Sequence, residues 1–438
     1  MKEHSFYRSG SAFRKILAVV LFLVFPVTSA HSATYYVSKT GNDTNPGTKA
    51  KPWGTIRKAA TTLIAGDTVY IKAGTYKEIV VPLRSGSPDK YITYAAFPGS
   101  KVTIDGKGKR LAFDFGVFDM SGKDYIKVSG LRVINSSQTG IVADRSTGII
   151  IEKCSTFNTA QSGIAAWACK NLIINGNEVN RACTGKWHEC ISVGGTDTFE
   201  IKNNYVHHAG NPGKEGIDVE GGSSNGKVYG NLVHDTMLGI YVDAWNKHAY
   251  NIEVYGNITH DNKGDGIALA SEQGGLLENI KVYNNISYNN GWSGIDISGC
   301  CVSTHPMKGI TVINNTFYNN GNQDWGNGLY IDNPQIADFI FRNNICSKNT
   351  TSQISLDFSV SPEVLTIDHN LIDGDSDHYG SDYVLEDPAF VDPDAADFHL
   401  REGSPAIDAG SSDNAPDNDF EGNPRPKGSG YDIGAFEF

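Results

Sequence analysis

The stretch VYGNLVHDTMLGIYVD (228–243) returns 26 residues later as VYGNITHDNKGDGIALA (254–270), and this repeated pattern indicates how the chain folds. Each begins with an apolar-x-apolar segment ending in Asn and continues to Gly-Ile followed by alternating residues. The Asn recurs at Asn177, Asn204, Asn231, Asn257, Asn285, Asn315 and Asn344, with gaps of 27, 27, 26, 28, 30 and 29 residues. The Gly-Ile element recurs from GIVAD at Gly140 to GLYID at Gly328. Such a period indicates a repeat architecture.

The repeat predicts an all-β solenoid of parallel strands. Each period holds two or three strands of about four residues, separated by Gly and Asn where the chain turns through left-handed conformations. No segment between them is long enough for the crossover helices of a doubly wound sheet. Each strand instead pairs with its copy in the next coil, about 4.8 Å away. We expect a parallel β-helix in which the recurrent Asn side chains hydrogen-bond along the axis.

Both ends of the chain depart from the repeat. Ile56, Ala59, Ala60 and Leu63 mark one face of a short helix within 55–66, which would cover the open edge of the first coil. From about residue 382 the repeats fade into segments rich in Pro, Gly and Asp. We expect a signal peptide (1–33), an N-terminal strand and helix cap (34–80), a β-helix (81–380), and a C-terminal cap and tail (381–438).

The N-terminus has the pattern of an export signal. Basic residues through Lys15 precede an apolar run, Ile16 to Phe25, that is too short to span a bilayer comfortably. Small residues follow, which predicts cleavage after Ala30 or Ala33, and a membrane anchor is the alternative. We expect a secreted protein, extracellular or periplasmic, with no membrane insertion after cleavage.

Composition excludes several classes of protein. The 438 residues are 39% hydrophobic and 20% charged, with 48 Gly and 16 Pro, unlike disordered, collagen-like or multi-span membrane proteins. The net charge is −12, and the first 33 residues hold four basic side chains and one acidic side chain, so the remainder carries −12 − 3 = −15. Because nucleic-acid binding needs basic surfaces, no nucleic-acid partner is expected.

The seven Cys are expected to be structural. Cys183 and Cys190 could close a short loop, and Cys300 and Cys301 are adjacent. An odd number leaves at least one thiol free or paired with another molecule.

Acidic residues gather at alternate positions of the Gly-Ile strands. In each strand the Ile and the residue two later point inward, so the intervening residues are expected to face solvent. The outward residues in successive coils are Ser192 and Gly194, Asp218 and Glu220, Tyr241 and Asp243, Ala268 and Ala270, and Asp296 and Ser298. Glu189, Glu215, Asp265 and Glu272 lie in the flanking turns. Register places Glu220 and Asp243 about 5 Å apart at the backbone, with Asp218 beside them.

This arrangement suits glycosidic cleavage, because crowded carboxylates repel one another and one keeps a raised pKa. A protonated acid and an ionised partner are what a glycoside hydrolase needs, and a close pair suits retention. We assign Asp243 as nucleophile or stabiliser and Glu220 as acid/base, with Glu272 as its competitor and Asp218 as a further candidate.

Two alternatives remain open from the residues. In a calcium-dependent polysaccharide lyase, Glu215, Asp218, Glu220 and Asp243 would bind Ca²⁺, and Lys214, Lys186 or Lys247 would remove the proton. An epimerase acting on uronates would need the same Ca²⁺ site and the same kind of base. In a non-catalytic glycan-binding β-helix the acids would form a solvated or calcium-binding face.

Aromatic side chains near the same face indicate a sugar ligand, since flat rings stack on pyranose faces. Trp187, Tyr241, Trp245 and Trp292 are the candidates, with His188, Lys214 and Lys247 as further substrate-binding residues. His234-Asp235 and His260-Asp261 recur at one repeat position, which favours a structural role.

The segments YYVSKTGNDTNPGTKAKPWGTI (35–56) and AGDTVYIKAGTYKE (65–78), the coils, and the closing DIGAFEF (432–438) resemble secreted proteins of the pectate lyase-like superfamily. The resemblance covers nearly the whole mature chain and implies export and a right-handed, single-stranded parallel β-helix. Similar openings occur in family 9 pectate lyases and in family 120 xylosidases.

The motifs for particular reactions match only in part. GIYVDAW (239–245) with GIALASEQGG (266–275) looks like the Asp and Glu coils of family 120, but Ala270 stands where the Glu would align and the acid falls at Glu272. The paired-aspartate calcium signature of family 9 is missing. GIDVEGGSSNGKV (216–228) is similar to an alginate-lyase family 6 strand, with Gly222 in place of the lysine base.

The sequence therefore predicts a secreted enzyme that cleaves glycosidic bonds in a polysaccharide or oligosaccharide, with hydrolysis slightly ahead of calcium-assisted elimination. No cofactor is expected for hydrolysis, and Ca²⁺ for the lyase.

Overall fold

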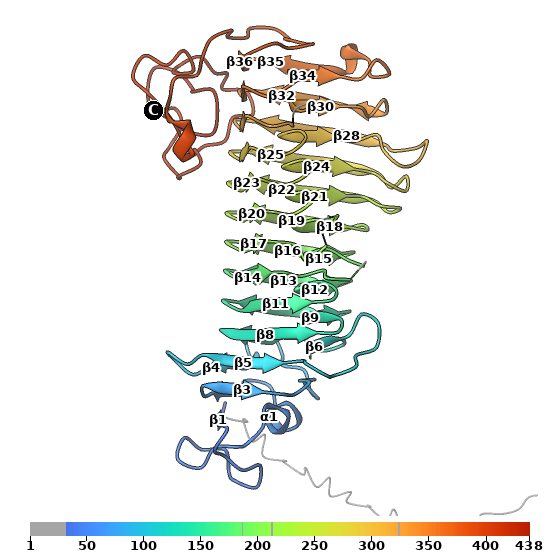
Figure 1. Cartoon of the computed structure of the whole chain (residues 1–438), viewed down its shortest axis with the longest axis vertical. Coiled ribbons are helices and arrows are strands. Elements are labelled where there is room, and N and C mark those ends of the chain that lie inside the picture. The colour runs from blue at the N-terminus through green and yellow to red at the C-terminus, as the bar shows by residue number, and fades with distance from the viewer. Residues whose placement is uncertain (1–31, 186, 212, 323–324) are drawn as a thin grey trace, which may run out of the picture. The chain divides into compact units, whose positions relative to one another are not determined.

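The computed structural model describes residues 32–185, 187–211, 213–322 and 325–438. The signal segment expected over 1–33 falls almost wholly outside these ranges. Residues 32–438 form one compact unit built of stacked coils (Figure 1). Within the described ranges, no helix has the length and apolar character needed to cross a membrane.

Three long parallel sheets run along the coils, and nearly every strand pairs with its copy in the next coil. The first sheet contains β1 (Thr34–Val37), β2 (Thr68–Ile71), β4 (Ile92–Ala96), β7 (Ile126–Ser129), β10 (Thr147–Glu152), β13 (Lys170–Asn175), β16 (Asp197–Lys202), β19 (Ser224–Tyr229), β22 (Ala249–Tyr255), β25 (Leu277–Tyr283), β28 (Met307–Ile313), β32 (Phe339–Arg342) and β35 (Leu365–Asp368), with β31 (Ile336–Ala337) on β28.

The second sheet contains β3 (Gly74–Tyr76), β5 (Val102–Asp105), β8 (Leu131–Ser136), β11 (Ser155–Thr159), β14 (Glu178–Asn180), β17 (Tyr205–His207), β20 (Leu232–His234), β23 (Ile258–His260), β26 (Ile286–Tyr288), β29 (Thr316–Tyr318), β33 (Ile345–Ser347) and β36 (Leu371–Asp373). The third sheet contains β6 (Gly116–Asp119), β9 (Thr139–Asp144), β12 (Ile164–Trp167), β15 (Ile191–Gly194), β18 (Ile217–Glu220), β21 (Ile240–Asp243), β24 (Ile267–Ala270), β27 (Ile295–Ile297), β30 (Asn327–Ile331) and β34 (Ser352–Leu356). The predicted parallel β-helix is confirmed.

The core follows the predicted alternation of the Gly-Ile strands. Ile217 and Val219 of β18 and Ile240 and Val242 of β21 are fully buried and lie in register. The residue before each recurrent Asn takes a left-handed backbone, as at Gly230 with φ 62°, which explains why Gly or Asn occupies it.

The recurrent Asn side chains form the expected ladder inside the solenoid. The Nδ2 of Asn177 donates to Oδ1 of Asn204 at 3.0 Å, and the Nδ2 of Asn204 donates to Oδ1 of Asn231 at 3.0 Å. The same bond continues through Asn344, whose Nδ2 donates to Oδ1 of Asn370 at 3.2 Å. These bonds satisfy amides that are buried away from water.

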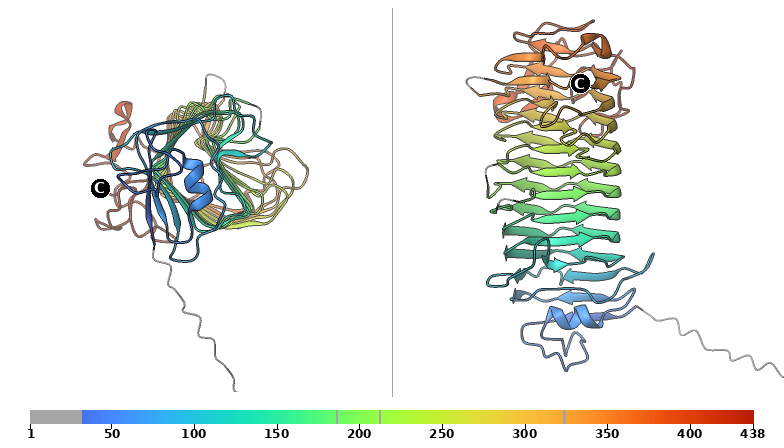
Figure 2. Two further views of the ribbon diagram at one scale, coloured as in Figure 1. Left: turned by 90° about the horizontal axis from the view of Figure 1, so that it is seen from below. Right: turned by 90° about the vertical axis from the view of Figure 1, so that its right-hand side faces the viewer.

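The predicted helix is α1 (Ile56–Thr62), and the face predicted to pack inward is buried. The Thr55 hydroxyl caps it by accepting a hydrogen bond from the Lys58 backbone N–H at 3.0 Å. Figure 2 shows α1 lying across the open end of the coils. The segment 34–80 also contributes strands, because β1 pairs with β2 and β2 with β4.

The C-terminal segment carries little regular structure. It holds an antiparallel pair, β37 (Phe390–Asp392) and β38 (Asp397–Leu400), and the 3-10 turn η2 (Pro393–Ala395); a further turn, η1 (Pro362–Val364), precedes β35. Its apolar side chains form a second core against the last coils of the second sheet, containing Phe390, Phe398, Ile433 and Phe436.

Candidate functional site

The outer face of the third sheet brings the predicted acidic residues together. Ser192 pairs with Asp218, Asp218 with Tyr241, and Tyr241 with Ala268 in successive coils. Glu220 and Asp243 directly follow the paired residues Val219 and Val242, so they occupy equivalent positions on neighbouring coils. The register inferred from the repeat is therefore correct.

The prediction that these positions face solvent is wrong. Only 3% of Asp218, 8% of Tyr241 and 1% of Asp243 is exposed. Asp243 is covered because its own turn and the turn of the next coil both bond to it: the backbone N–H groups of Trp245 and Glu272 donate to its Oδ1 at 2.8 and 3.0 Å. Outward positions of a solenoid are buried wherever the following turns fold back over the sheet.

Three carboxylates form a compact group at the centre of this face. Glu189, Asp218 and Glu220 each place an oxygen within 4.8 Å of the others. Glu189 accepts from the Ser192 hydroxyl at 2.9 Å and pairs with the Lys214 ammonium at 3.5 Å. Asp218 Oδ1 is buried without a hydrogen-bond partner.

Burial and like charge raise the pKa of these groups. Burial, followed by repulsion from Glu189, raises the pKa of Glu215 to about 7, and burial with the charges of Glu189 and Asp243 raises the pKa of Glu220 to about 7. The same causes raise the pKa of Asp218 well above its usual range. Burial raises the pKa of Asp243 only to about 6, because the two backbone N–H groups oppose it. The cluster therefore shares protons near neutral pH.

Glu272 lies beside Asp243 from a turn rather than a strand. The Tyr241 hydroxyl donates to its carboxylate at 2.7 Å, and the disulfide sulfurs of Cys300 and Cys301 lie within 4.8 Å of it. The remaining thiols among the predicted structural cysteines are free and buried, including Cys183 and Cys190, so the short loop between these two is not closed by a disulfide.

Glu220 also lines a pocket that extends toward earlier coils. The other lining residues are Phe113, Asp114, Phe115, Asp119, Ser121, Asp144, Arg145, Trp167 and His188. Most of these were not predicted, although the register contains the signal: Asp144, Trp167, Gly194 and Glu220 occupy one outward column. Extending the predicted column by two coils beyond Gly194 identifies first Trp167 and then Asp144 at the end of β9, which Arg145 follows.

Some of the predicted aromatic residues lie at this pocket, and others lie on later coils. His188 bonds to Asp114 at 2.9 Å and lies 5.2 Å from the Trp167 ring. Trp187 is 63% exposed and packs edge-on against Phe113. Trp245 lies on the turn that covers Asp243. Trp292 packs edge-on against Trp325 at 6.3 Å, four coils beyond β15.

The lysine candidates differ in their surroundings. Lys214 is half-buried beside Glu189. The stem of Lys247 lies over Gly222, where an added Cβ would meet the Lys247 Cβ at 2.9 Å. Lys186 lies outside the described residues.

A second acidic group continues the face toward the C-terminus. Burial raises the pKa of Asp265 to about 7, and burial with neighbouring charge raises the pKa values of Asp296 and Asp332. The acids are thus not confined to the stretch from Glu189 to Glu272.

Fold and face together define a parallel β-helix with an acidic, partly covered outer face. We call the cluster of Glu189, Asp218, Glu220 and Asp243 on this face, with the pocket beside Glu220, the acidic groove. A family profile described as "Right handed beta helix region" matches residues 115–275 and 182–333, together half of the chain, and "Pel9A-like, right handed beta helix region" matches residues 35–182. The chain therefore belongs to the pectate lyase-like superfamily of right-handed β-helix proteins.

Individual relatives are distant. The uncharacterized protein YwoF of Bacillus subtilis (strain 168) is 27% identical over 462 residues, covering 89% of this chain and 96% of that protein. Pectate lyase PEL9 of Emericella nidulans is 28% identical over 156 residues, covering 33% of this chain and 37% of the lyase.

Two solved structures show the same fold along the chain. A complex of XylC with xylose has a TM-score of 0.63 at 15% identity, covering 92% of this chain and 98% of XylC. Pectate lyase Pel9A has a TM-score of 0.56 at 17% identity, covering 93% of this chain and 96% of Pel9A. At these identities the likeness establishes the fold.

Proposed function

We propose that the protein is a secreted carbohydrate-active enzyme that hydrolyses glycosidic bonds, with Asp243 as the nucleophile and Glu220 as the acid/base. One observation carries the proposal. A buried carboxylate, Asp243, and a half-buried one, Glu220, occupy equivalent positions on neighbouring coils. Two backbone N–H groups favour ionisation of Asp243, while partial burial and surrounding charge favour protonation of Glu220. Environments that push two carboxyl pKa values apart distinguish an acid from a nucleophile.

The reaction follows from these two states. Glu220 donates its proton to the leaving oxygen while Asp243 attacks the anomeric carbon and forms a glycosyl ester. Glu220, now ionised, removes a proton from water, which attacks the anomeric carbon and releases Asp243. Two displacements at the same carbon retain its configuration. Glu272 accepts a hydrogen bond from Tyr241 and is the competing acid/base.

The sugar is proposed to bind in the pocket beside Glu220. Trp167 and Phe113 offer apolar ring surface there, and Asp114, Asp144 and Arg145 offer polar groups to hydroxyls. The likeness to a xylose complex and to a pectate lyase leaves both neutral and uronic sugars as substrates to test.

The test is a panel of neutral and uronic polysaccharides and aryl glycosides, assayed for reducing ends with the mature protein. Asp243→Asn is expected to lower kcat about 10³-fold, as loss of a catalytic carboxylate does. Asp296→Asn removes a half-buried carboxylate from the Asp218 column three coils away and serves as the matched control. Equal activity in Asp243→Asn and Asp296→Asn would refute the assignment.

A calcium-assisted lyase is the second candidate, and the unpartnered Asp218 oxygen favours it. Glu189, Asp218 and Glu220 present hard oxygen donors at a spacing that one Ca²⁺ can bridge, so the residues fit the ion. Bound there, Ca²⁺ would neutralise a uronate carboxylate. Lys214, beside Glu189, is the candidate base for the C5 proton.

Product chemistry separates the two reactions. Ultraviolet absorbance from an unsaturated uronate that disappears with chelator, and in Asp218→Asn, would establish the lyase. Reducing ends without that absorbance, insensitive to chelator, would establish the hydrolase. Binding of glycan without either product would assign the protein as a non-catalytic module.

A further inference from the structure

A second cluster of functional side chains lies on the outer face of the second sheet, away from the acidic groove. His207 ends β17 and pairs in register with His234 at the end of β20, which pairs with His260 at the end of β23. The residues that follow, His208, Asp235 and Asp261, all take left-handed backbone conformations, with φ of 53°, 54° and 50°. Each coil therefore presents an adjacent pair of side chains at the same corner.

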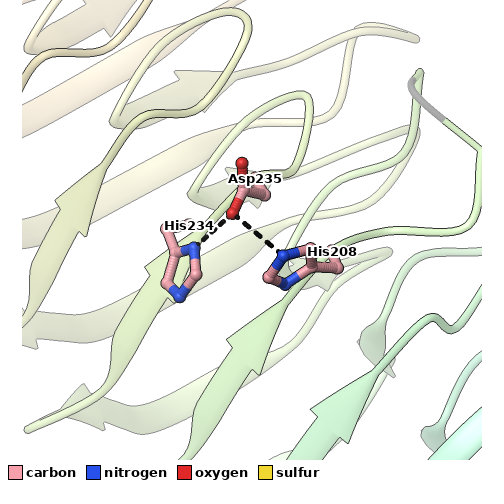
Figure 3. A group of neighbouring side chains, drawn as sticks. All are labelled: His208, His234 and Asp235. Carbon is pink, nitrogen blue, oxygen red and sulfur yellow. Dashed lines mark hydrogen bonds and ion pairs between the residues drawn. The ribbon is translucent and has the colours of Figure 1, made fainter.

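Three of these side chains converge. His234 Nδ1 lies 2.6 Å from Asp235 Oδ2, and His208 Nε2 from the preceding coil lies 3.6 Å from the same oxygen. Figure 3 shows both rings directed at this carboxylate, and the three ligand atoms lie within 4.8 Å of one another. In a tetrahedral site with ligands at about 2.0–2.2 Å, pairs of ligand atoms lie about 3.4 Å apart, so small side-chain rotations suffice.

Outer partners orient both imidazoles. The far nitrogen of His234, Nε2, lies 2.9 Å from the Tyr205 hydroxyl. The far nitrogen of His208, Nδ1, lies 2.6 Å from Nδ1 of His207, whose Nε2 faces Glu178 at 3.4 Å.

One protonation pattern satisfies all of these contacts. His234 donates from Nε2 to Tyr205, His208 donates from Nδ1 to His207, and His207 donates from Nε2 to Glu178. With a metal ion bound, this pattern leaves the lone pairs of His234 Nδ1 and His208 Nε2 to coordinate the ion beside the Asp235 oxygen. Without an ion, the 2.6 Å contact is satisfied when His234 Nδ1–H donates to Asp235. Hydrogen bonds to the remote ring nitrogens are how proteins prepare histidines as metal ligands.

We propose that His208, His234 and Asp235 bind one divalent transition-metal ion of the Zn²⁺ type, which links the coils of β17 and β20. Two imidazoles and one carboxylate favour Zn²⁺ over Ca²⁺ or Mg²⁺, which prefer oxygen. The His208 and Asp235 side chains are 61% and 47% exposed, so they are free to adjust, and water can complete the coordination. The His234 side chain is 13% exposed and is the fixed member of the set.

The next coil supplies a matched control. His260 Nδ1 lies 2.7 Å from Asp261 Oδ2, which reproduces the His234–Asp235 pair. The position that His208 fills in the first set is filled here by Asp235, so a second imidazole is missing. His260→Ala removes an equivalent ring from the same column and leaves all three proposed ligands in place. Because the His260 ring stacks on His234 with the centroids 4.8 Å apart, this variant controls for the loss of ring packing along the column.

The experiment titrates untagged, chelator-treated mature protein with Zn²⁺ by calorimetry and with Co²⁺ by visible absorption. We expect one ion per chain, affinity at least about 100-fold weaker in His208→Ala, His234→Ala and Asp235→Asn, about tenfold weaker in Tyr205→Phe, and unchanged in His260→Ala. Zn²⁺ should also raise the Tm of the wild type and of His260→Ala but not of His234→Ala.

The ligand variants keep the acidic groove intact, so Zn²⁺ bound by the groove carboxylates would persist in them. Persistence of full affinity in His208→Ala and His234→Ala, or equal loss in His260→Ala, would overturn the proposal. If a ligand variant fails to fold without metal, the metal affinity of Tyr205→Phe and the ligand-field spectrum of Co²⁺ in the wild type test the proposed coordination instead. A wild-type spectrum without imidazole coordination would overturn it. Neither result depends on glycosidic activity.

Discussion

At the scale of single residues, Asp243 and Glu220 show how backbone hydrogen bonds from neighbouring turns change the pKa of a carboxylate. Both side chains project from the same sheet, but only Asp243 accepts two backbone hydrogen bonds from covering turns. Their pKa values, about 6 and about 7, place the working protonation state, Asp243 ionised and Glu220 protonated, in a narrow range of pH.

We therefore expect kcat/KM to follow a bell centred between about pH 6 and 7. Activity falls at lower pH as Asp243 is protonated and at higher pH as Glu220 loses its proton. With an aryl glycoside whose leaving group needs no proton, Glu220→Gln should abolish the alkaline limb and keep the acid limb. An alkaline limb that survives in Glu220→Gln and disappears in Glu272→Gln would transfer the acid role to Glu272.

The alternation of residues was sufficient to predict which acids share a face, since Asp218, Glu220 and Asp243 follow from period-two strands. Their burial could not be predicted, because it depends on turns such as 271–275, whose path over the sheet has no periodic signal. Arg145 was missed for a related reason: it lies in a turn one residue past a strand, and its approach to Glu220 depends on the register of four coils.

At the scale of elements, the internal Asn ladder couples each coil to the next. Asn257 donates from Nδ2 to Asn285 Oδ1 and to the Val228 carbonyl, both at 2.9 Å, and accepts from Asn231 at 2.9 Å. An outer ladder at the surface repeats the pattern, because Asn251 Nδ2 donates to Asn225 Oδ1 at 3.0 Å. Only the inner rungs lack access to water.

Replacing an inner Asn of the ladder should therefore lower the free energy of unfolding far more than replacing an outer one. Asn257→Ala leaves buried donors and acceptors on both neighbouring coils unpaired, which we expect to lower the free energy of unfolding by about 3 kcal/mol. Asn251→Ala leaves its neighbours in contact with water, so it should lower the free energy of unfolding by only about 1 kcal/mol, mostly because Ala is disfavoured in the left-handed backbone at φ 56°. Urea unfolding followed by circular dichroism measures both, and equal losses would show that burial of the rung is irrelevant.

At the scale of the whole molecule, the acidic groove opposes folding while peripheral ion pairs support it. Asp218 carries a raised pKa in a buried position without a counter-ion at its Oδ1. Asp368 pairs with the Arg342 guanidinium at 2.7 Å, and hydrogen bonds and charge from Arg342 and His369 lower its pKa against burial. The two carboxylates therefore contribute to stability with opposite dependence on pH.

For Asp218 the folded protein holds a proton more tightly than the unfolded chain, so its contribution to stability falls as pH rises from about 4 through neutrality. Asp218→Asn removes this cost and should raise the free energy of unfolding at pH 7, with little gain at pH 4.

Asp368→Asn should do the reverse. The low pKa of Asp368 stabilises the fold above the unfolded pKa and is lost as pH falls, so the variant is destabilised at pH 7 and approaches the wild type in acid. Thermal unfolding of both variants at pH 4 and 7, with chelator present, tests the pair. Ca²⁺ bound by Glu189, Asp218 and Glu220 would supply the missing counter-charge. A Tm that rises with Ca²⁺ at pH 7 in the wild type but not in Asp218→Asn would therefore favour the lyase over the hydrolase.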